Sequence, residues 1–440
     1  LELLSLPMEV LIKITKMLTQ KEMIQLAKTC KSLKRIVYSK EFWSSTQVFM
    51  NLLDDTSDYK IIYSSLNARG LYSLYFFVSS YHVLIKHLYL IRYFWPKLTL
   101  LCDLTKNRVT EVVDELKDIP PVRLRNLCTF VSAKINRQTF NTFQHVLHSI
   151  SYLSISSSSC DDNIAHKLVK CKNFKVLNLS RTLVTNLGVK RLCGFRRTKC
   201  GVTYDIEESL FNLEIIDISN NMYLNEKCWK FLKGLDNLKI LTISVIDEIC
   251  PGVESFKEIL NIKFLTSLNI DSANSPEGIM LALSAIESKL KALSFKSCQL
   301  RDCALLTLES PTGFKSISCL KISSEVLTDN GIFSVCDHLK QLVILDISDC
   351  INLTDICLVN ITNRLEKRRL LCVIGCTKMT VSQLDKKRQE SKDCVIQSDF
   401  DLKMPDLGKI ADEELREVFF YYHFLNDSLY LTPNFRKNVL

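Results

Sequence analysis

Residues whose types and spacing could perform catalysis are scarce in this 440-residue sequence. It contains no His-Glu-x-x-His pair for a metal and no Gly-x-Ser-x-Gly nucleophile turn. Its 11 glycines leave little material for a phosphate-binding loop, and no Cys-x-x-Cys pair suggests a zinc site. His166 and Cys171 lie close in sequence, but no third group accompanies them. We therefore expect no catalytic residue, no metal site and no cofactor.

Polar residues that could bind a protein instead recur at a regular spacing. They lie between, or directly after, two apolar residues that are one position apart, as Asp346 lies between Leu345 and Ile347. Because strand side chains alternate between two faces, such residues should point away from the core. The residues with the clearest binding chemistry are Asp217, Asn269, Asp271, Lys296, Lys321 and Asp346. Small hydroxyls dominate the neighbouring positions, so we expect a low, polar groove suited to an extended peptide or a protein edge. The alternative is a solvated sheet face, with substrate recognised elsewhere.

The apolar pairs recur along most of the chain and define a repeated unit. They are Leu153-x-Ile155, Leu177-x-Leu179, Ile216-x-Ile218, Leu241-x-Ile243, Leu268-x-Ile270, Leu293-x-Phe295, Leu320-x-Ile322, Leu345-x-Ile347 and Leu371-x-Val373. Successive pairs lie 24 to 27 residues apart, except for one interval of 39. There the polar stretch Arg196–Glu208 predicts a loop inserted between neighbouring units. This pattern and period resemble leucine-rich repeats, and a single strand cannot bury its apolar face without neighbouring copies.

A helix-like segment follows most of these strands, and several such segments begin with Asp or Asn, which can cap free amides there. Strand, turn and helix in alternation predict the α/β class. We expect a right-handed leucine-rich-repeat solenoid with a concave parallel β-sheet and convex helices, preceded by three short helices. Two earlier apolar pairs, Leu74-x-Phe76 and Leu98-x-Leu100, are candidate degenerate repeats.

Residues 4–43 carry a separate helical pattern. Leu6-Pro7 opens a helix, with Glu9 near the positive end of the helix dipole. The whole pattern comprises Leu6, Pro7, Glu9, Ile14, Leu18, Leu26, Cys30 and Trp43. As a set it resembles the F-box family. It departs from the family pattern at Leu33, where an aromatic residue is common, and at Thr29, where Val is common.

An F-box followed by leucine-rich repeats resembles the substrate receptors of Skp–cullin–F-box (SCF) ubiquitin ligases. The resemblance implies that the eight residues named above bind the Skp adaptor, and through it cullin and RING subunits, while the repeats bind a protein substrate. It also implies a non-catalytic role, in which substrate is held near a charged conjugating enzyme. A net charge of +4 over residues 1–43 suits the acidic adaptor of that family. A repeat scaffold that binds a protein partner without ubiquitination is the alternative.

Composition limits the other partners. The net charge of +9 is spread along the chain, so we expect no nucleic acid, although the Arg196–Lys199 stretch and the lysine run at 386–392 are the basic segments that such binding would use. The apolar run at 71–81 is interrupted by His82 and Lys86, so we expect no membrane span. Eighteen cysteines without a visible signal peptide favour a reduced protein of the cytoplasm and/or nucleus.

These patterns predict four regions. Residues 1–45 form the F-box, and 46–120 form linker helices and candidate degenerate repeats. Residues 121–385 form the solenoid, and 386–440 form a C-terminal cap helix, expected at 411–426, and a tail.

Overall fold

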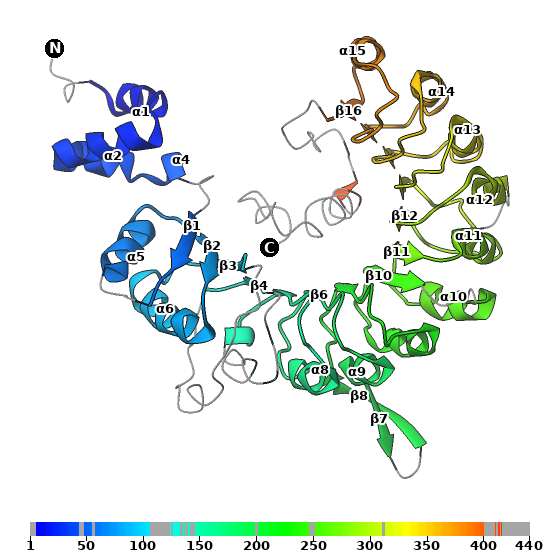
Figure 1. Ribbon diagram of the computed structural model, residues 1–440, viewed down its shortest axis with the longest axis horizontal. Helices are drawn as coiled ribbons and strands as arrows, with labels where there is room; N and C mark the ends of the chain where they lie inside the picture. Colours follow the sequence, from blue (N-terminus) through cyan, green and yellow to red (C-terminus); the bar gives the residue numbers. More distant parts are fainter. Residues whose placement is uncertain are drawn as a thin grey trace. The chain divides into compact units, whose positions relative to one another are not determined.

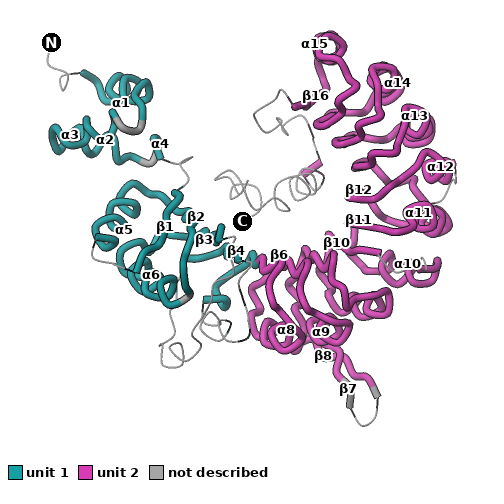
Figure 2. The backbone as a smooth tube through the Cα atoms, viewed as in Figure 1, with its two compact units in different colours: residues 1–153, 428–440 teal, residues 154–427 magenta. Residues whose placement is uncertain are grey.

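The computed structural model divides the chain into two compact units, which are described separately (Figure 2). Unit 1 comprises residues 1–153 and 428–440, and unit 2 comprises residues 154–427. The structure describes residues 6–43, 48–54, 58–105, 124, 126–132, 135, 137, 140, 146–198, 201–245, 251–309, 313–399, 410, 412–413 and 415. The predicted cap helix and tail lie outside this part of the chain, apart from residues 412, 413 and 415.

Short helices open unit 1, in agreement with the predicted helical pattern. They are α1 (Met8–Lys16), α2 (Gln20–Thr29), α3 (Lys31–Val37) and the single turn α4 (Lys40–Trp43). A capping box begins α2, where the Thr19 hydroxyl accepts from the Glu22 amide and the Glu22 carboxylate accepts from the Thr19 amide. Leu11, Leu33 and Ile36 form the small buried core that holds these helices together.

The remainder of unit 1 alternates strands with helices. Its elements are β1 (Val48–Leu52), α5 (Tyr59–Ala68), β2 (Ser73–Val78), α6 (Tyr81–Phe94), β3 (Leu100–Asp103), β4 (Thr129–Val131) and β5 (Tyr152–Ser154), which reaches the boundary with unit 2. The sequence aligned Leu74 with Leu98, but the observed neighbour of Leu74 is Leu101. The difference arises because Leu98 still belongs to the turn after α6, where its amide donates to the Trp95 carbonyl.

Unit 2 continues the alternation through the predicted repeats (Figure 1). Its strands are β6 (Val176–Asn178), β9 (Ile215–Asp217), β10 (Ile240–Val245), β11 (Ser267–Ala273), β12 (Ala292–Lys296), β13 (Cys319–Ile322), β14 (Ile344–Asp346), β15 (Leu370–Cys372) and β16 (Val395–Gln397). Its helices are α8 (Asp162–Leu168), α9 (Asn186–Leu192), the 3-10 helix η3 (Glu226–Gly234), α10 (Val253–Leu260), α11 (Pro276–Ser284), α12 (Asp302–Leu305), the 3-10 turn η4 (Leu306–Glu309), α13 (Asp329–His338), α14 (Asp355–Arg364) and α15 (Val381–Glu390). Within this unit the helices line the side of the strands opposite the sheet's open face (Figure 1).

The described strands form one 14-stranded sheet. Pairing is parallel from β1 to β4 in unit 1, and from β6 through β9 to β16 in unit 2. The observed register equates Leu177 with Ile216, and Leu345 with Leu371, as the spacing of the apolar pairs requires. The predicted α/β solenoid class is therefore confirmed. The array also extends further than the sequence indicated, because α15 runs to Glu390 and β16 pairs with β15.

The predicted loop between the repeats of β6 and β9 is instead an antiparallel hairpin. Its strands are β7 (Cys193–Thr198) and β8 (Gly201–Ser209). Apolar and polar residues alternate along β8, and the Tyr204 ring packs against Phe195 at 5.1 Å between centroids. The insertion was predicted correctly, but its description as a loop was wrong. The alternation typical of a strand was missed because it lies within a strongly polar stretch.

Neighbouring repeats are joined at the starts of their helices. The Asp329 carboxylate accepts from the amide and hydroxyl of Thr354 at 2.9 and 2.5 Å. Asp302 does the same with Thr328, and Asp355 with Thr380. An Asp at the first turn of one helix thus accepts hydrogen bonds from the residue that precedes the next helix. This contact fixes the spacing between helices.

Cysteines also join the repeats, in the turn that follows each strand. The thiols of Cys298, Cys350 and Cys376 donate to carbonyls of the preceding repeat, at 3.7, 3.5 and 3.1 Å. Burial raises the pKa of Cys298 and Cys350 to about 12, so both remain thiols. No disulfide joins cysteines of the described residues.

Gly331 tests the close approach between helices. A methyl group at this position would lie 2.6 Å from the Asp302 carboxylate and 2.6 Å from a Leu327 methyl. Gly331→Ala should therefore destabilise unit 2 by about 1–3 kcal/mol through overpacking. Chemical denaturation measures this loss. The control is Gly252→Ala, which meets no atom within 4 Å. Because Gly252 precedes a helix, this control should cost less than about 1 kcal/mol. Equal losses in both variants would contradict the overpacking argument.

Candidate binding surfaces

The predicted adaptor-binding residues divide into an inward-facing and an outward-facing group. Leu6, Leu26 and Cys30 are partly buried against the core of α1 to α3. Leu18 is half-buried, whereas Pro7, Glu9 and Ile14 are exposed. The first three residues therefore shape the domain, and the last three are available to a partner.

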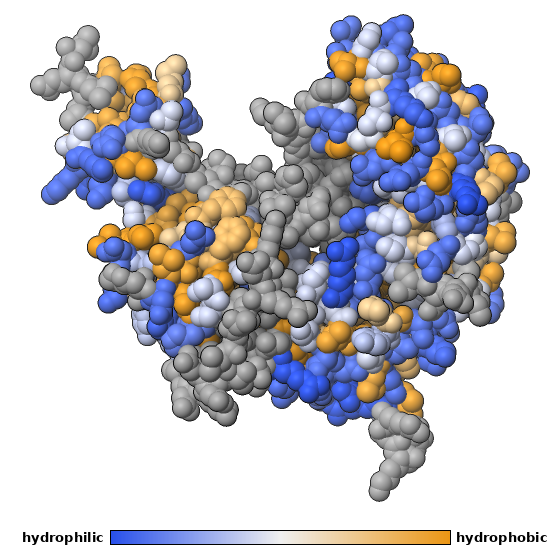
Figure 3. Space-filling model, in the orientation of Figure 1, coloured by the Kyte–Doolittle hydropathy of each residue, from blue (hydrophilic) through white to orange (hydrophobic). Residues whose placement is uncertain are grey.

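Helix α1 exposes more apolar surface than the sequence indicated. Met8, Val10, Ile14 and Met17 are all exposed, with Ile14 at 37% and Met17 at 87%. Figure 3 shows hydrophobic surface gathered over this helix. Met8, Val10 and Met17 had not been predicted as binding residues. The spacing of Val10, Ile14 and Met17 predicted one apolar helix face. The sequence could not tell that this face is exposed while the adjoining face with Leu11 is buried, because packing decides this.

Trp43 lies inside unit 1 and has no accessible face for a partner. It is 4% exposed, and its indole N–H donates to the Val37 carbonyl at 2.5 Å. The Arg69 guanidinium, from α5, lies 4.8 Å from the Trp43 ring and donates to the Tyr38 hydroxyl at 3.1 Å. Trp43 therefore packs the helical domain against α5. Its part in adaptor binding stays a prediction.

The predicted substrate-binding residues form a row across unit 2. The register aligns Asn178, Asp217, Thr242, Asn269, Ser294, Lys321, Asp346 and Cys372 on successive strands. Asp271 and Lys296 are aligned with each other, two residues beyond Asn269 and Ser294 on the same strands. The sequence thus identified the row correctly. Binding of substrate by these residues stays a prediction.

Most of these side chains are buried and hydrogen-bonded locally. The Asp217 carboxylate accepts from the Ser219 amide and hydroxyl at 3.0 and 2.7 Å. Asn178 does the same with Ser180 at 2.9 and 2.8 Å. An amide oxygen and a carboxylate oxygen therefore fill the same role at the strand ends. Asp271 and Asn269 are buried too, while Lys296 is half-buried and remains accessible.

Lys321 and Asp346 form a buried ion pair on this face. The Lys321 Nζ lies 2.8 Å from an Asp346 carboxylate oxygen, with the side chains 13% and 1% exposed. Burial lowers the pKa of Lys321, but the charge and hydrogen bond of Asp346 outweigh this effect and raise the pKa above its usual value. Because a buried charge needs its partner, neither residue is a free handle for substrate.

Asp217 lacks such a cation at contact distance. Burial raises its pKa to about 6, the bonds from Ser219 oppose the rise, and Asp271 adds to it. The folded state therefore favours the protonated carboxyl. This preference stabilises the fold fully below about pH 4, and the contribution is lost as pH rises through about 6.

The same substitution at two positions should consequently have opposite effects. Asp217→Asn keeps the oxygen that Ser219 needs, as Asn178 shows, and removes a buried charge. It should stabilise the protein at pH 7.5 by on the order of 2 kcal/mol, with no gain near pH 4. Asp346→Asn leaves Lys321 without its countercharge and should cost about 3 kcal/mol. Denaturant unfolding of both variants at the two pH values measures this. A loss of stability in Asp217→Asn at pH 7.5 would contradict the burial argument.

His166 and Cys171, which lie close in sequence, differ in exposure. Burial raises the pKa of Cys171 to about 12, while His166 is exposed, so the two do not form a catalytic pair. No group of three or more His, Cys, Asp or Glu side chains that could hold a metal occurs in the described part of the chain. Within that part, no helix has the length and apolar character to cross a membrane.

Comparisons with known proteins identify the N-terminal domain. Residues 3–46 match the family model described as F-box-like, which confirms the resemblance drawn from the sequence. No curated protein sequence matches the chain.

Two solved structures are similar to the chain at low identity. An internalin from Listeria monocytogenes is 13% identical to this chain, with a TM-score of 0.33. The match covers 70% of this chain and 82% of the internalin chain. A chain of the Rad7 and Elc1 complex in yeast is also 13% identical to this chain, with a TM-score of 0.42. The match covers 88% of this chain and 91% of the yeast chain. At such TM-scores neither likeness carries an argument about function.

Proposed function

Because an F-box-like domain at residues 3–46 precedes a solenoid of the leucine-rich-repeat type, we propose that the chain is the substrate-recognition subunit of an SCF-type E3 ubiquitin ligase. The observation that carries this proposal is the exposed apolar face along α1 inside that domain, formed by Val10, Ile14 and Met17. An exposed apolar patch on a small folded domain marks a protein-binding site. The proposed occupant is the Skp adaptor, which would connect the chain to cullin and RING subunits.

The role is non-catalytic in this proposal. The chain would hold a protein substrate so that its lysines meet a charged conjugating enzyme on other subunits, which raises their effective concentration. A reduced chain with free cysteines accords with action in the cytoplasm and/or nucleus.

The open face of the sheet in unit 2 is the proposed substrate surface. Small polar side chains form its surface. The local hydrogen bonds and the Lys321–Asp346 ion pair described above hold these side chains in place. Half-buried residues along the row, such as Lys296 and Ser323, remain accessible to a partner. A flat polar surface of this kind suits an extended peptide or a protein edge better than a small molecule.

Replacing Ile14 by Glu tests adaptor binding. Ile14 is exposed, so Ile14→Glu should leave the helical domain folded while placing a charge in the apolar interface, where it should weaken binding by at least about 2 kcal/mol. Co-purification of the adaptor with the full chain measures the loss, and circular dichroism checks the fold. The matched control is Ile61→Glu on α5, where the side chain is 73% exposed. Equal adaptor recovery from both variants would refute the proposed interface. Adaptor binding without substrate ubiquitination in a reconstituted ligase would favour the scaffold alternative.

Charge reversal at Lys296 tests the substrate surface. Lys296→Glu alters the accessible part of the row without breaking the Lys321–Asp346 pair. It should weaken binding of substrate proteins captured from cells by about 1–2 kcal/mol, while adaptor binding stays unchanged. Quantitative affinity purification measures both. Lys263→Glu, an exposed change elsewhere in unit 2, is the control. If the two variants capture the same proteins in equal amounts, substrate binds elsewhere.

A further inference from the structure

The β7–β8 hairpin extends outward past α9 on the helix side of unit 2, away from the open sheet face (Figure 1). Its strand β8 exposes Val202, Tyr204 and Ile206, at 56%, 43% and 45%. Val202 and Tyr204 are two positions apart in the regular part of the ladder, so their side chains share one face. Apolar side chains gathered on a projecting element mark a candidate interaction site.

This face of the hairpin is held on η3 by an aromatic cluster. The Phe195 ring lies 5.1 Å from the Tyr204 ring and 5.3 Å from the Phe231 ring of η3, between centroids. The Tyr204 hydroxyl donates to the Gly234 carbonyl at 3.3 Å. A methyl group on Gly234 would lie 3.0 Å from the Phe195 and Tyr204 rings, so the hairpin approaches η3 closely. The exposed apolar residues are therefore presented by a positioned element.

Two lysines flank the same aromatic cluster. The Nζ of Lys190, from α9, lies 5.5 Å from the centroid of the Phe231 ring, and the Nζ of Lys230 lies 5.4 Å from it. Cation–π attraction holds both ammonium groups at one ring although they repel each other. Within the described ranges of the chain, neither lysine forms an ion pair. Each therefore keeps N–H donors and charge for another partner.

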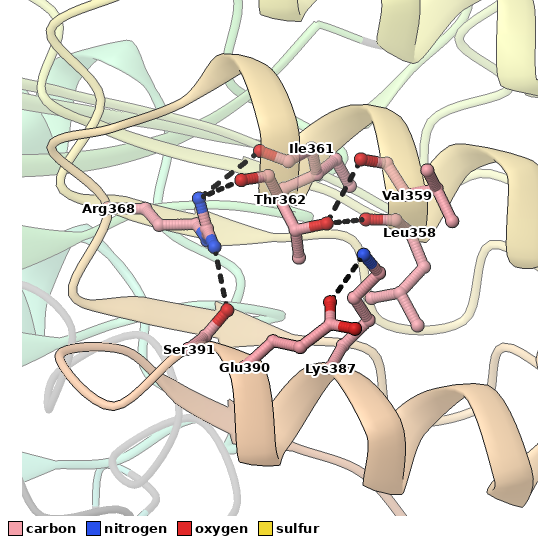
Figure 4. Close-up of polar contacts among 8 residues, drawn as sticks. All are labelled: Leu358, Val359, Ile361, Thr362, Arg368, Lys387, Glu390 and Ser391. Carbon is pink, nitrogen blue, oxygen red and sulfur yellow. Dashed lines mark hydrogen bonds and ion pairs between the residues drawn. The ribbon is translucent and has the colours of Figure 1, made fainter.

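Basic residues on other helices of unit 2 are paired more fully. Lys257 on α10 lies 2.6 Å from the Glu254 carboxylate. Lys387 on α15 lies 2.7 Å from the Glu390 carboxylate (Figure 4). Helices α9 and η3 together carry five basic residues and one acidic residue, whereas α10 and α11 carry one basic and three acidic residues. The excess of positive charge is thus local to the two helices beside the hairpin.

We propose that the hairpin surface, formed by Lys190, Lys230, Phe231, Tyr204 and Val202, binds an acidic segment of a partner protein that also carries apolar side chains. Carboxylates of the segment would meet the two lysines, and its apolar side chains would cover the hairpin. Nucleic acid would satisfy the lysines too, but its sugars and phosphates offer the aliphatic side chain of Val202 no apolar partner. The exposed apolar residues therefore favour a protein segment. This site lies outside both surfaces described above and does not rest on the proposed function.

The test is fluorescence anisotropy of the full chain with a labelled synthetic peptide in which Asp and Glu alternate with Leu and Phe. Wild type should bind this peptide saturably. Lys230→Glu should weaken binding about tenfold through charge reversal, and Lys190→Glu should act similarly. The matched control is Lys263→Glu, because Lys263 also lies over an exposed phenylalanine ring, 4.7 Å from the centroid of Phe264, but has no hairpin beside it. This control should change binding less than about twofold.

Two further variants separate the apolar contact from the charge. Val202→Ser should weaken binding about threefold, whereas Val381→Ser, at a valine of similar exposure on α15, should leave it unchanged. Burial, and then the charge of Asp236, raise the pKa of Tyr204, so the Asp236 carboxylate lies near the surface. Asp236→Asn should tighten peptide binding about twofold, because it removes a charge that repels the segment.

Three results would overturn the proposal. One is equal weakening in Lys230→Glu and Lys263→Glu. Another is unchanged affinity for a peptide in which Ser replaces every Leu and Phe, because the hairpin would then take no part. The third is tighter binding of an oligothymidylate than of the peptide, with the same dependence on Lys190 and Lys230, which would identify a nucleic-acid site instead. Circular dichroism checks the fold of each variant. If Lys190→Glu does not fold, the exposed changes Lys230→Glu and Val202→Ser decide the question.

Discussion

The register between neighbouring parallel strands is the constraint on which the rest of the solenoid depends. Many of these strands are only three residues long, as β14 and β15 are, so no strand has enough contacts to be stable alone. Each repeat is fixed at two places. Asp329 and its equivalents accept hydrogen bonds from the residue before the next helix, while Cys350 and its equivalents donate to the preceding repeat. Slippage of one residue would break both contacts.

The same register determines the character of the open sheet face. It brings Lys321 beside Asp346 and Asn269 beside Ser294. Once aligned, the charged groups find partners within the fold, so the face is polar without being strongly charged. In the proposed function, a partner would meet a surface of small polar side chains and accessible residues such as Lys296. This organisation accords with a binding subunit, because the face needs little rearrangement to receive a partner.

The helical domain follows a different rule, since its core is too small to bury all of its apolar residues. Leu11 packs inward against α3, whereas Ile14 on the same helix and Met17 directly after it remain exposed. The helical domain is too small to bury this apolar face itself. The F-box-like match supports the proposal that the Skp adaptor covers it. Trp43 and Arg69 meanwhile connect the domain to α5 within unit 1. The helical domain is thus packed against the first strand–helix unit.

The sequence by itself determined the repeat, the parallel sheet and the helical domain, because a period of 24 to 27 residues and the alternation of apolar residues are local properties of the chain. It also identified the polar row from Asn178 to Cys372. Tertiary structure decided which of those side chains remain available. Asp217, Asp271 and Asp346 look like exposed handles in sequence, but neighbouring strands and local hydrogen bonds bury them. Likewise, Trp43 is indistinguishable in sequence from a surface anchor, and the approach of Lys190 and Lys230 to one ring depends on how α9 packs against η3. Exposure and hydrogen-bond satisfaction are properties of contacts between distant segments, and no local pattern encodes them.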